Sequence, residues 1–203
     1  MHDIHSHLLS VFLGFFAIMN PLANTAVFVG LTSNQDSAAR RSTALKALTL
    51  TFILITIFAV LGKVIFEFFG ITLPALRIAG GVLVFMIGYH MVQGQNSSLH
   101  HAEDDMESDI AVSPLAVPIL AGPGTIATTM NFAATESHLK ALLTVAVYGV
   151  VCVITFVCFL SGQRMLSRLG ANGVDVITRL MGLILAVIGV QMLTTGVHGA
   201  IAA

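Results

Sequence analysis

The sequence predicts an all-α polytopic membrane protein with six transmembrane helices, arranged as two inverted three-helix repeats. Three observations support this prediction. First, 56% of the 203 residues are hydrophobic and only 9% are charged, whereas soluble domains are roughly 25% charged. Second, long runs without any charged residue separate the few charged ones. Third, proline, arginine and glycine residues recur at a constant offset of 102 positions, from Pro21 to Pro123 and from Arg77 to Arg179. A water-soluble chain could not bury so much apolar surface, so the lipid bilayer is an expected partner.

The charge-free runs place the individual helices. About 20 apolar residues cross the hydrocarbon as a helix, and helices are expected because lipid cannot satisfy free backbone groups. The second span is short between its charges, and it crosses only if Lys46 and Lys63 extend to the two interfaces. The predicted spans are residues 8–31, 44–66, 74–94, 111–134, 141–161 and 175–196.

The polar segments predict the domain organisation and the topology. The first repeat is expected at residues 1–94, an acidic polar linker at 95–110 and the second repeat at 111–203. A solvated connector is the simplest interpretation of the linker, and a docking tail or cation site is the alternative. Lysine and arginine concentrate in the loop that holds Arg40 and Arg41 and in the loop that holds Arg164 and Arg168. Positive residues favour the cytoplasmic side, so both termini are expected outside the cell.

The repeat has a functional implication. Each half contains three spans, so the second half enters the membrane from the opposite side. Inverted repeats of this kind are typical of secondary transporters, which alternate access by rocking one part of the bundle against another. The repeat therefore favours a transporter without proving one.

Each half also contains one span that is interrupted near its middle, by Asn20-Pro21 in the first half and by Gly122-Pro123-Gly124 in the second. Proline removes a backbone donor and clashes with the preceding turn. Unpaired backbone at this depth is tolerated only where it faces protein or a water-filled cavity, and a helix that restarts there directs its amides and positive dipole end into the gap. A shared substrate-binding pocket is expected from Asn20, Pro21, Asn24, Thr25, Gly122, Pro123, Gly124, Thr125 and Thr128. The alternative is a pair of structural kinks whose threonines bond to their own helices.

Other polar residues are less specific. Arg77 and Arg179 are expected either to extend to the interfaces or to act as gates or partners within the bundle. Tyr89, His90 and Gln93 could line a path or anchor the helix end. No aspartate or glutamate is expected at mid-membrane depth, so if an ion is coupled, sodium held by carbonyls and hydroxyls is favoured over a proton. Uptake driven by a proton gradient and indifferent to sodium would contradict that hypothesis.

Several classes of protein are not expected. The net charge of −1 gives no basic footprint for nucleic acid. The sequence contains no metal motif, no phosphate-binding glycine loop and no nucleophile–base pair, so neither a metal, nor another cofactor, nor an enzymatic activity is expected. A homo-oligomer is left open.

The same residues give the chain a resemblance to a known family. It resembles the MarC family, also described as a neutral amino acid transporter family, over residues 9–197. The resemblance is carried by Asn20-Pro21-Leu22-Ala23-Asn24, Arg77-Ile78-Ala79-Gly80-Gly81, Ala121-Gly122-Pro123-Gly124-Thr125 and Thr178-Arg179-Leu180-Met181-Gly182.

This resemblance implies a six-span protein of the bacterial inner membrane. An archaeal member is described as transporting small neutral amino acids such as glycine and alanine, and the family name comes from an association with multiple antibiotic resistance. The expected function is therefore secondary transport of a small-molecule substrate, with a neutral amino acid as the first choice. The alternatives are a non-transporting assembly or regulatory protein that acts through residues 95–109, and a drug-export protein.

Overall fold

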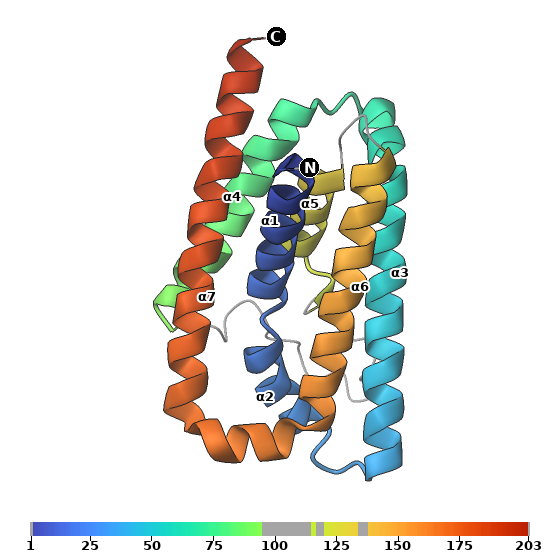
Figure 1. Ribbon diagram of the computed structural model, residues 1–203, viewed down its shortest axis with the longest axis vertical. Coiled ribbons are helices and arrows are strands. Elements are labelled where there is room, and N and C mark those ends of the chain that lie inside the picture. Colours follow the sequence, from blue (N-terminus) through green and yellow to red (C-terminus); the bar gives the residue numbers. More distant parts are fainter. Residues whose placement is uncertain (1, 95–114, 117–119, 134–137, 203) are drawn as a thin grey trace.

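A computed structural model of the chain describes residues 2–94, 115–116, 120–133 and 138–202. Within these ranges the chain forms helices and turns and no strand, which confirms the predicted all-α fold class. Figure 1 shows the helices packed side by side along the long axis of the molecule, with both termini toward the same end. The helices are α1 (His2–Met19), α2 (Pro21–Leu31), α3 (Ser37–Phe69), α4 (Leu73–Val92), α5 (Pro123–Ala133), α6 (His138–Leu160) and α7 (Gly162–Ile201).

Five stretches are long and apolar enough to cross a membrane among the residues that the structure describes. They are Ser6–Leu31, which includes α1 and α2, then Ser37–Gly62, Leu73–Val92, Leu139–Leu160 and Gly162–Ile201. They contain the predicted first and sixth spans, all but the last one or two residues of the third and fifth, and most of the second. The fourth predicted span, residues 111–134, is described only in part, and α5 alone has 11 residues. Six crossings therefore remain a prediction, and the linker at 95–110 lies outside the described residues.

The segment after α6 differs from its prediction. A loop was expected between the spans at 141–161 and 175–196, but α7 begins at Gly162 and is already helical through this region. Its first part lies across the lower end of the bundle in Figure 1 before the helix turns upward. The segment is rich in glutamine, arginine, methionine and leucine, which are good helix formers. The turn occurs at Gly170, where φ is 66° and ψ is 171°.

Gly170→Ala is expected to destabilise the protein through its backbone alone. This combination of φ and ψ is essentially restricted to glycine, and forcing another residue into such a region costs about 1–3 kcal/mol. A β-carbon at Gly170 would meet nothing within 4 Å, so crowding does not contribute. Thermal unfolding in detergent should show a lower Tm for Gly170→Ala, whereas Gly173→Ala, with a helical backbone and an ordinary contact to Leu169, should not. Equal Tm values for the two variants would contradict this account.

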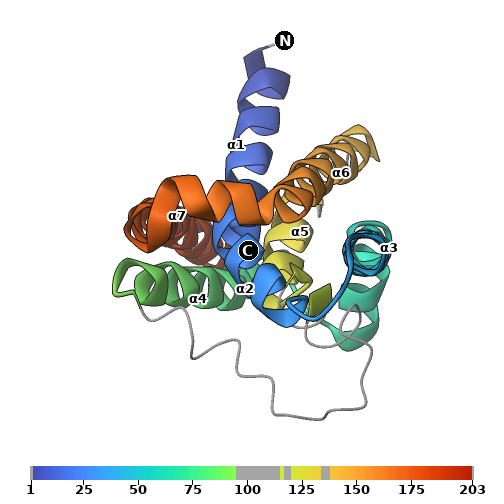
Figure 2. The same ribbon diagram turned by 90° about the horizontal axis from the view of Figure 1, so that it is seen from below.

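Two groups of helices pack around the centre of the molecule. Figure 2 shows α4 and α7 side by side on one flank and α3 with α6 on the other, while α1, α2 and α5 lie between them. The larger apolar core joins α1, α2, α3 and α6 through buried residues such as Phe15, Phe28 and Tyr148. A smaller core joins α4 and α7 to α1 through Val84, Leu185 and Ala17.

The α4–α7 pair is held by direct contact between backbones. Glycines recur every seven residues on the facing sides, at Gly81 and Gly88 of α4 and at Gly182, Gly189 and Gly196 of α7. A β-carbon added at Gly189 would lie 2.5 Å from the Phe85 backbone nitrogen, and one at Gly88 would lie 2.5 Å from the Gly182 carbonyl oxygen. Small residues allow membrane helices to approach this closely, and van der Waals packing then stabilises the pair. The pair is therefore a tightly joined antiparallel unit.

Candidate functional site

The first predicted break is present between α1 and α2. α1 ends at Met19 and α2 begins at Pro21, and Asn20 between them adopts the left-handed conformation, with φ 38° and ψ 69°. Asparagine visits this region more readily than most residues. Pro21 has no N–H, so the carbonyl of Ala17, four residues earlier, has no helical donor. The local sequence therefore both breaks the helix and tolerates the backbone geometry of the break.

Two asparagines close the ends that this break leaves open. The Asn20 side-chain oxygen accepts from the N–H of Ala23 at 3.4 Å, which caps the start of α2. The Asn24 side-chain amide donates to the carbonyl oxygen of Met19, the last residue of α1. Buried helix ends require such partners. Asn20 and Asn24 thus supply hydrogen bonds to both helix ends at the break.

The second predicted break is present before α5, and its chemistry is different. The Ala121 N–H donates to the Ala116 carbonyl oxygen at 2.8 Å, a bond across five residues that is typical of a π-turn. Gly122 is not helical, and α5 begins at Pro123. Because Gly122 has no side chain, it cannot cap the first-turn amides of Gly124 and Thr125 in the way that Asn20 caps α2. The position that caps α2 through the Asn20 side chain therefore supplies no such cap to α5.

Both breaks open on one cavity of about 970 Å³. From the breaks, α2 and α5 run in opposite directions along the bundle (Figure 1), so their N-termini face the same region. Six of the nine predicted site residues line the cavity, namely Asn20, Asn24, Gly122, Pro123, Gly124 and Thr125. The sequence therefore located the residues that surround this cavity at its centre, and their role in binding stays a prediction.

The other three predicted residues do not line the cavity. Pro21, Thr25 and Thr128 are buried. The Thr25 hydroxyl donates to the Pro21 carbonyl oxygen at 2.6 Å, which is the bonding to its own helix that the structural alternative describes. The Thr25 methyl group lies against α7, because a β-carbon added at Gly162 would be 2.8 Å from it. At Thr25 these contacts favour a packing role.

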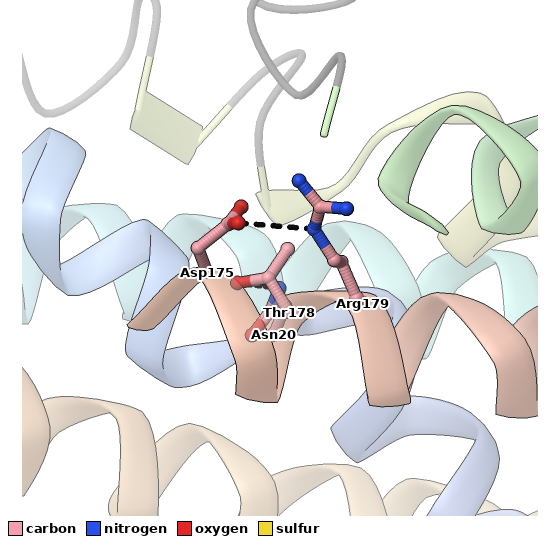
Figure 3. A network of polar contacts seen from close by, with 4 residues as sticks. All are labelled: Asn20, Asp175, Thr178 and Arg179. Atoms are coloured by element: carbon pink, nitrogen blue, oxygen red, sulfur yellow. Dashed lines mark hydrogen bonds and ion pairs between the residues drawn. The ribbon is translucent and has the colours of Figure 1, made fainter. Parts of the chain in front are cut away.

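The cavity also has lining residues on α7 that the sequence did not identify as site residues. The Asn20 amide donates to the Thr178 hydroxyl at 3.4 Å, so α7 contacts the first break directly. One turn earlier, Asp175 lines the cavity and pairs with Arg179 at 2.9 Å (Figure 3). Arg179 lies 102 residues after Arg77, and this recurrence was the sequence signal that could have pointed to Asp175 and Thr178 beside Arg179. Which helix would face the break was not visible in the sequence.

α4 supplies most of the remaining wall. Four of its apolar residues line the cavity, and so does His90. For His90 the sequence had left open whether it lines a path or anchors the helix end. The ring nitrogen Nδ1 of His90 is buried without a hydrogen-bond partner among the described residues. The apolar residues are Leu83, Met86, Ile87 and Met91. The result is a mostly apolar cavity whose few polar groups gather at the breaks, on α7 and at His90, as is usual for small-molecule sites.

Among the described residues, the lining of the cavity extends from the breaks toward the end of the bundle where α7 begins. Its described lining includes the first turns of α2, the second half of α4 and the first turns of α7, as far as Leu166 and Gly170. This is the end that holds Arg164 and Arg168 and lies away from the chain termini in Figure 1. Toward the termini, α4 instead packs closely on α5, and a β-carbon at Gly80 would lie 3.0 Å from that of Ala127.

A bundle of apolar helices in which one span is interrupted at Asn20, and in which α5 begins at Pro123 on the same cavity, defines a class, the polytopic membrane proteins with a discontinuous helix. The chain belongs to the MarC family of integral membrane proteins, whose family model matches residues 5–201. The resemblance drawn from the sequence motifs is thereby confirmed.

Individual relatives cover nearly the whole chain. The Bacillus subtilis protein named "UPF0056 membrane protein YvbG" is 42% identical over 202 residues, which cover 96% of this chain and 95% of that protein. The Escherichia coli K12 protein named "UPF0056 membrane protein YhcE" is 34% identical, with coverage of 93% and 90%. The protein of another E. coli strain, O139:H28, named "UPF0056 inner membrane protein MarC" is 34% identical, with coverage of 89% of each chain. No solved structure matches the chain.

Proposed function

We propose that this protein is a secondary transporter that moves a small polar solute, with a neutral amino acid as the first candidate, across the bacterial inner membrane. The observation that carries the proposal is the meeting of both helix breaks in one cavity. Interrupted helices at membrane depth are used by transporters to bind solutes and ions between two halves of a bundle. The name of the E. coli O139:H28 relative, an inner membrane protein, supports an inner-membrane location.

The proposal includes six crossings and an inverted repeat. Three features support this topology: α2 and α5 leave the breaks in opposite directions, α4 and α7 pack antiparallel, and Arg77 and Arg179 occupy equivalent positions of the two halves. With both termini toward one end and the basic segments at the other, the positive-inside rule places the termini in the periplasm. The cavity would then be open to the cytoplasm.

The polar groups of the cavity suit a zwitterion. The first turn of α5 offers the amides of Gly124 and Thr125 and the positive end of a helix dipole to a carboxylate. Oxygen atoms of Asn20, Asn24 and Asp175 are available on the opposing elements for an ammonium group. Asp175 and His90 both line the cavity, so a proton is as admissible a coupling ion as sodium, and the assay must compare them.

The proposal is tested by uptake into liposomes that hold the purified protein. Labelled glycine and alanine should accumulate above the level of protein-free liposomes and should be competed by the unlabelled compound. Imposed sodium and proton gradients, each with the other held at zero, should identify the coupling ion by the one that drives accumulation. Absence of uptake of any neutral amino acid under either gradient, with folded protein in the membrane, would refute the proposal.

Gly124→Ala is expected to reduce transport more than it reduces stability. A β-carbon there would lie 2.5 Å from Ile87 Cδ1 and 2.8 Å from Ile18 Cδ1, which are the ends of flexible side chains. These side chains can move aside at a cost of about 1 kcal/mol in the free energy of unfolding. Their displaced methyl groups then enter the cavity at the start of α5. Uptake should fall roughly tenfold, which corresponds to about 1.4 kcal/mol. Pro21→Ala is likewise expected to reduce transport more than stability. Equal losses of uptake and folding yield would show that both residues have a structural role.

A further inference from the structure

We infer that the hydrogen bond between Arg77 and Asn131 is the latch that closes the transport pathway on the side of the chain termini. The inference rests on the proposed function, because a latch is meaningful only for a pathway that opens in turn to each side. It identifies two residues outside the cavity, neither of which was predicted to bind substrate.

The two residues lie beyond the closed end of the cavity. The cavity ends at the start of α5, and Asn131 is eight residues further along that helix, about 12 Å at 1.5 Å per residue. Arg77 is in the second turn of α4. Its Nε donates to the Asn131 side-chain oxygen at 3.1 Å. Between this bond and the cavity, α4 and α5 pack closely, since a β-carbon at Gly80 would lie 3.0 Å from that of Ala127.

The bond joins the α4–α7 pair to α5, a central helix whose start lines the cavity together with α1 and α2. Arg77 belongs to the α4–α7 pair, whose backbones touch at the glycines described above. Asn131 belongs to α5, which also packs on α3, where a β-carbon at Gly62 would lie 3.3 Å from Met130. If the α4–α7 pair rocks against the other helices, this contact between α4 and α5 must separate to open the terminal side.

The equivalent position of the other repeat is bonded differently. Arg179 lies 102 residues after Arg77, on the side where the cavity is open. It pairs at 2.9 Å with Asp175, four residues earlier on its own helix, so this ion pair does not fasten α7 to α2. The closed side thus has its arginine bonded between helices, while the described ion pair on the open side is within one helix. This difference between equivalent residues is what a pair of gates in opposite states would show.

The latch can be tested without any substrate. Ala23, in the first turn of α2, lines the cavity and can carry a reporter cysteine after Cys152 and Cys158 are replaced by alanine. A membrane-impermeant thiol reagent is added to right-side-out or to inverted membrane vesicles that hold the full chain. In the parent protein the reporter should react from the side of Arg164 and scarcely from the side of the termini.

The variants have opposite expected effects. Asn131→Ala removes the acceptor and should raise the labelling rate from the terminal side about tenfold, since a hydrogen bond to a charged group is lost. Asn131→Asp keeps the size and makes the bond an ion pair, which is stronger, so terminal labelling should fall below that of the parent. Arg179→Gln is the matched control at the equivalent position and should not raise terminal labelling.

Three outcomes would overturn the latch: no change in terminal labelling for folded Asn131→Ala, an equal increase in Arg179→Gln, or a parent reporter that reacts equally from both sides. If Asn131→Ala does not fold, Asn131→Asp decides the question by the direction of its change. Because labelling needs no solute, latch-dependent labelling without uptake of any neutral amino acid in liposomes would refute the proposed solute and leave the gated pathway standing. Uptake of a neutral amino acid, together with terminal labelling that does not change in the Asn131 variants, would support the proposed transport and refute the latch.

Discussion

Gly189→Ala is expected to lower the Tm of the purified protein by about 6–12 °C. The added β-carbon would lie 2.5 Å from the Phe85 backbone nitrogen and 2.7 Å from its Cα. Backbone atoms cannot rotate away as a side-chain end can, so α4 and α7 must separate along their contact. Overpacking of a well-packed interior costs about 1–3 kcal/mol, and a clash with backbone belongs at the upper end. For a chain of this length, each kcal/mol corresponds to about 2–4 °C.

Gly30→Ala is the matched control for this effect. It adds the same methyl group to α2, where a β-carbon would meet nothing within 4 Å. Alanine is also the better helix former, so the Tm should stay the same or rise slightly. Gly88→Ala should behave like Gly189→Ala, because its β-carbon would lie 2.5 Å from the Ala186 backbone nitrogen. Similar Tm values for Gly30→Ala and Gly189→Ala would show that the helix pair is not held by backbone contact.

The second large effect is expected at Asn20, where conformation and chemistry can be separated. Asn20→Ala should cost about 2–3 kcal/mol of stability, because it loses the cap on Ala23, worth about 1 kcal/mol, and places alanine in the left-handed region, at about 1–2 kcal/mol. Asn20→Gly should cost much less stability, because glycine adopts this φ freely. Its replacement of a capping residue costs only a few tenths of a kcal/mol. Both variants remove the amide that bonds to Thr178 in the cavity wall.

Transport should therefore fall in both variants, while stability falls mainly in one. The measurement is the initial rate of glycine or alanine uptake per folded molecule, together with Tm for each variant. A rate in Asn20→Gly that equals the parent rate would mean that Asn20 serves only to shape the backbone. A loss of uptake in Asn20→Gly at nearly parental Tm would place the amide in the solute pathway.

The predictions that held were those that depend on local chemistry. A proline lacks its N–H wherever it lies, so Asn20-Pro21 and Gly122-Pro123-Gly124 interrupt their helices regardless of the surroundings. Hydrophobic runs bounded by charges likewise gave five of the spans to within a few residues at most ends. The prediction of a loop around Arg164 was wrong because polarity was taken to indicate a loop. The residues of this segment instead favour a helix, which lies along the end of the bundle.

The site was predictable only where it coincides with the breaks. Thr25 and Thr128 were included because they are polar and close in sequence, but the rotation of each helix turns them into the protein. Thr178 and Asp175 come from a helix about 150 residues away from the first break, and no local property of α7 shows that it packs there.

The sequence by itself determined that this protein belongs in a membrane and where its helices stop and restart, because composition and missing backbone donors are properties of the chain alone. Only the tertiary structure decided that the two gaps share one cavity, that this cavity reaches one end of the bundle, and that Arg77 crosses to another helix while Arg179 does not. The physical reason is that these outcomes depend on which helix faces meet, and glycine contacts far apart in the sequence set that geometry.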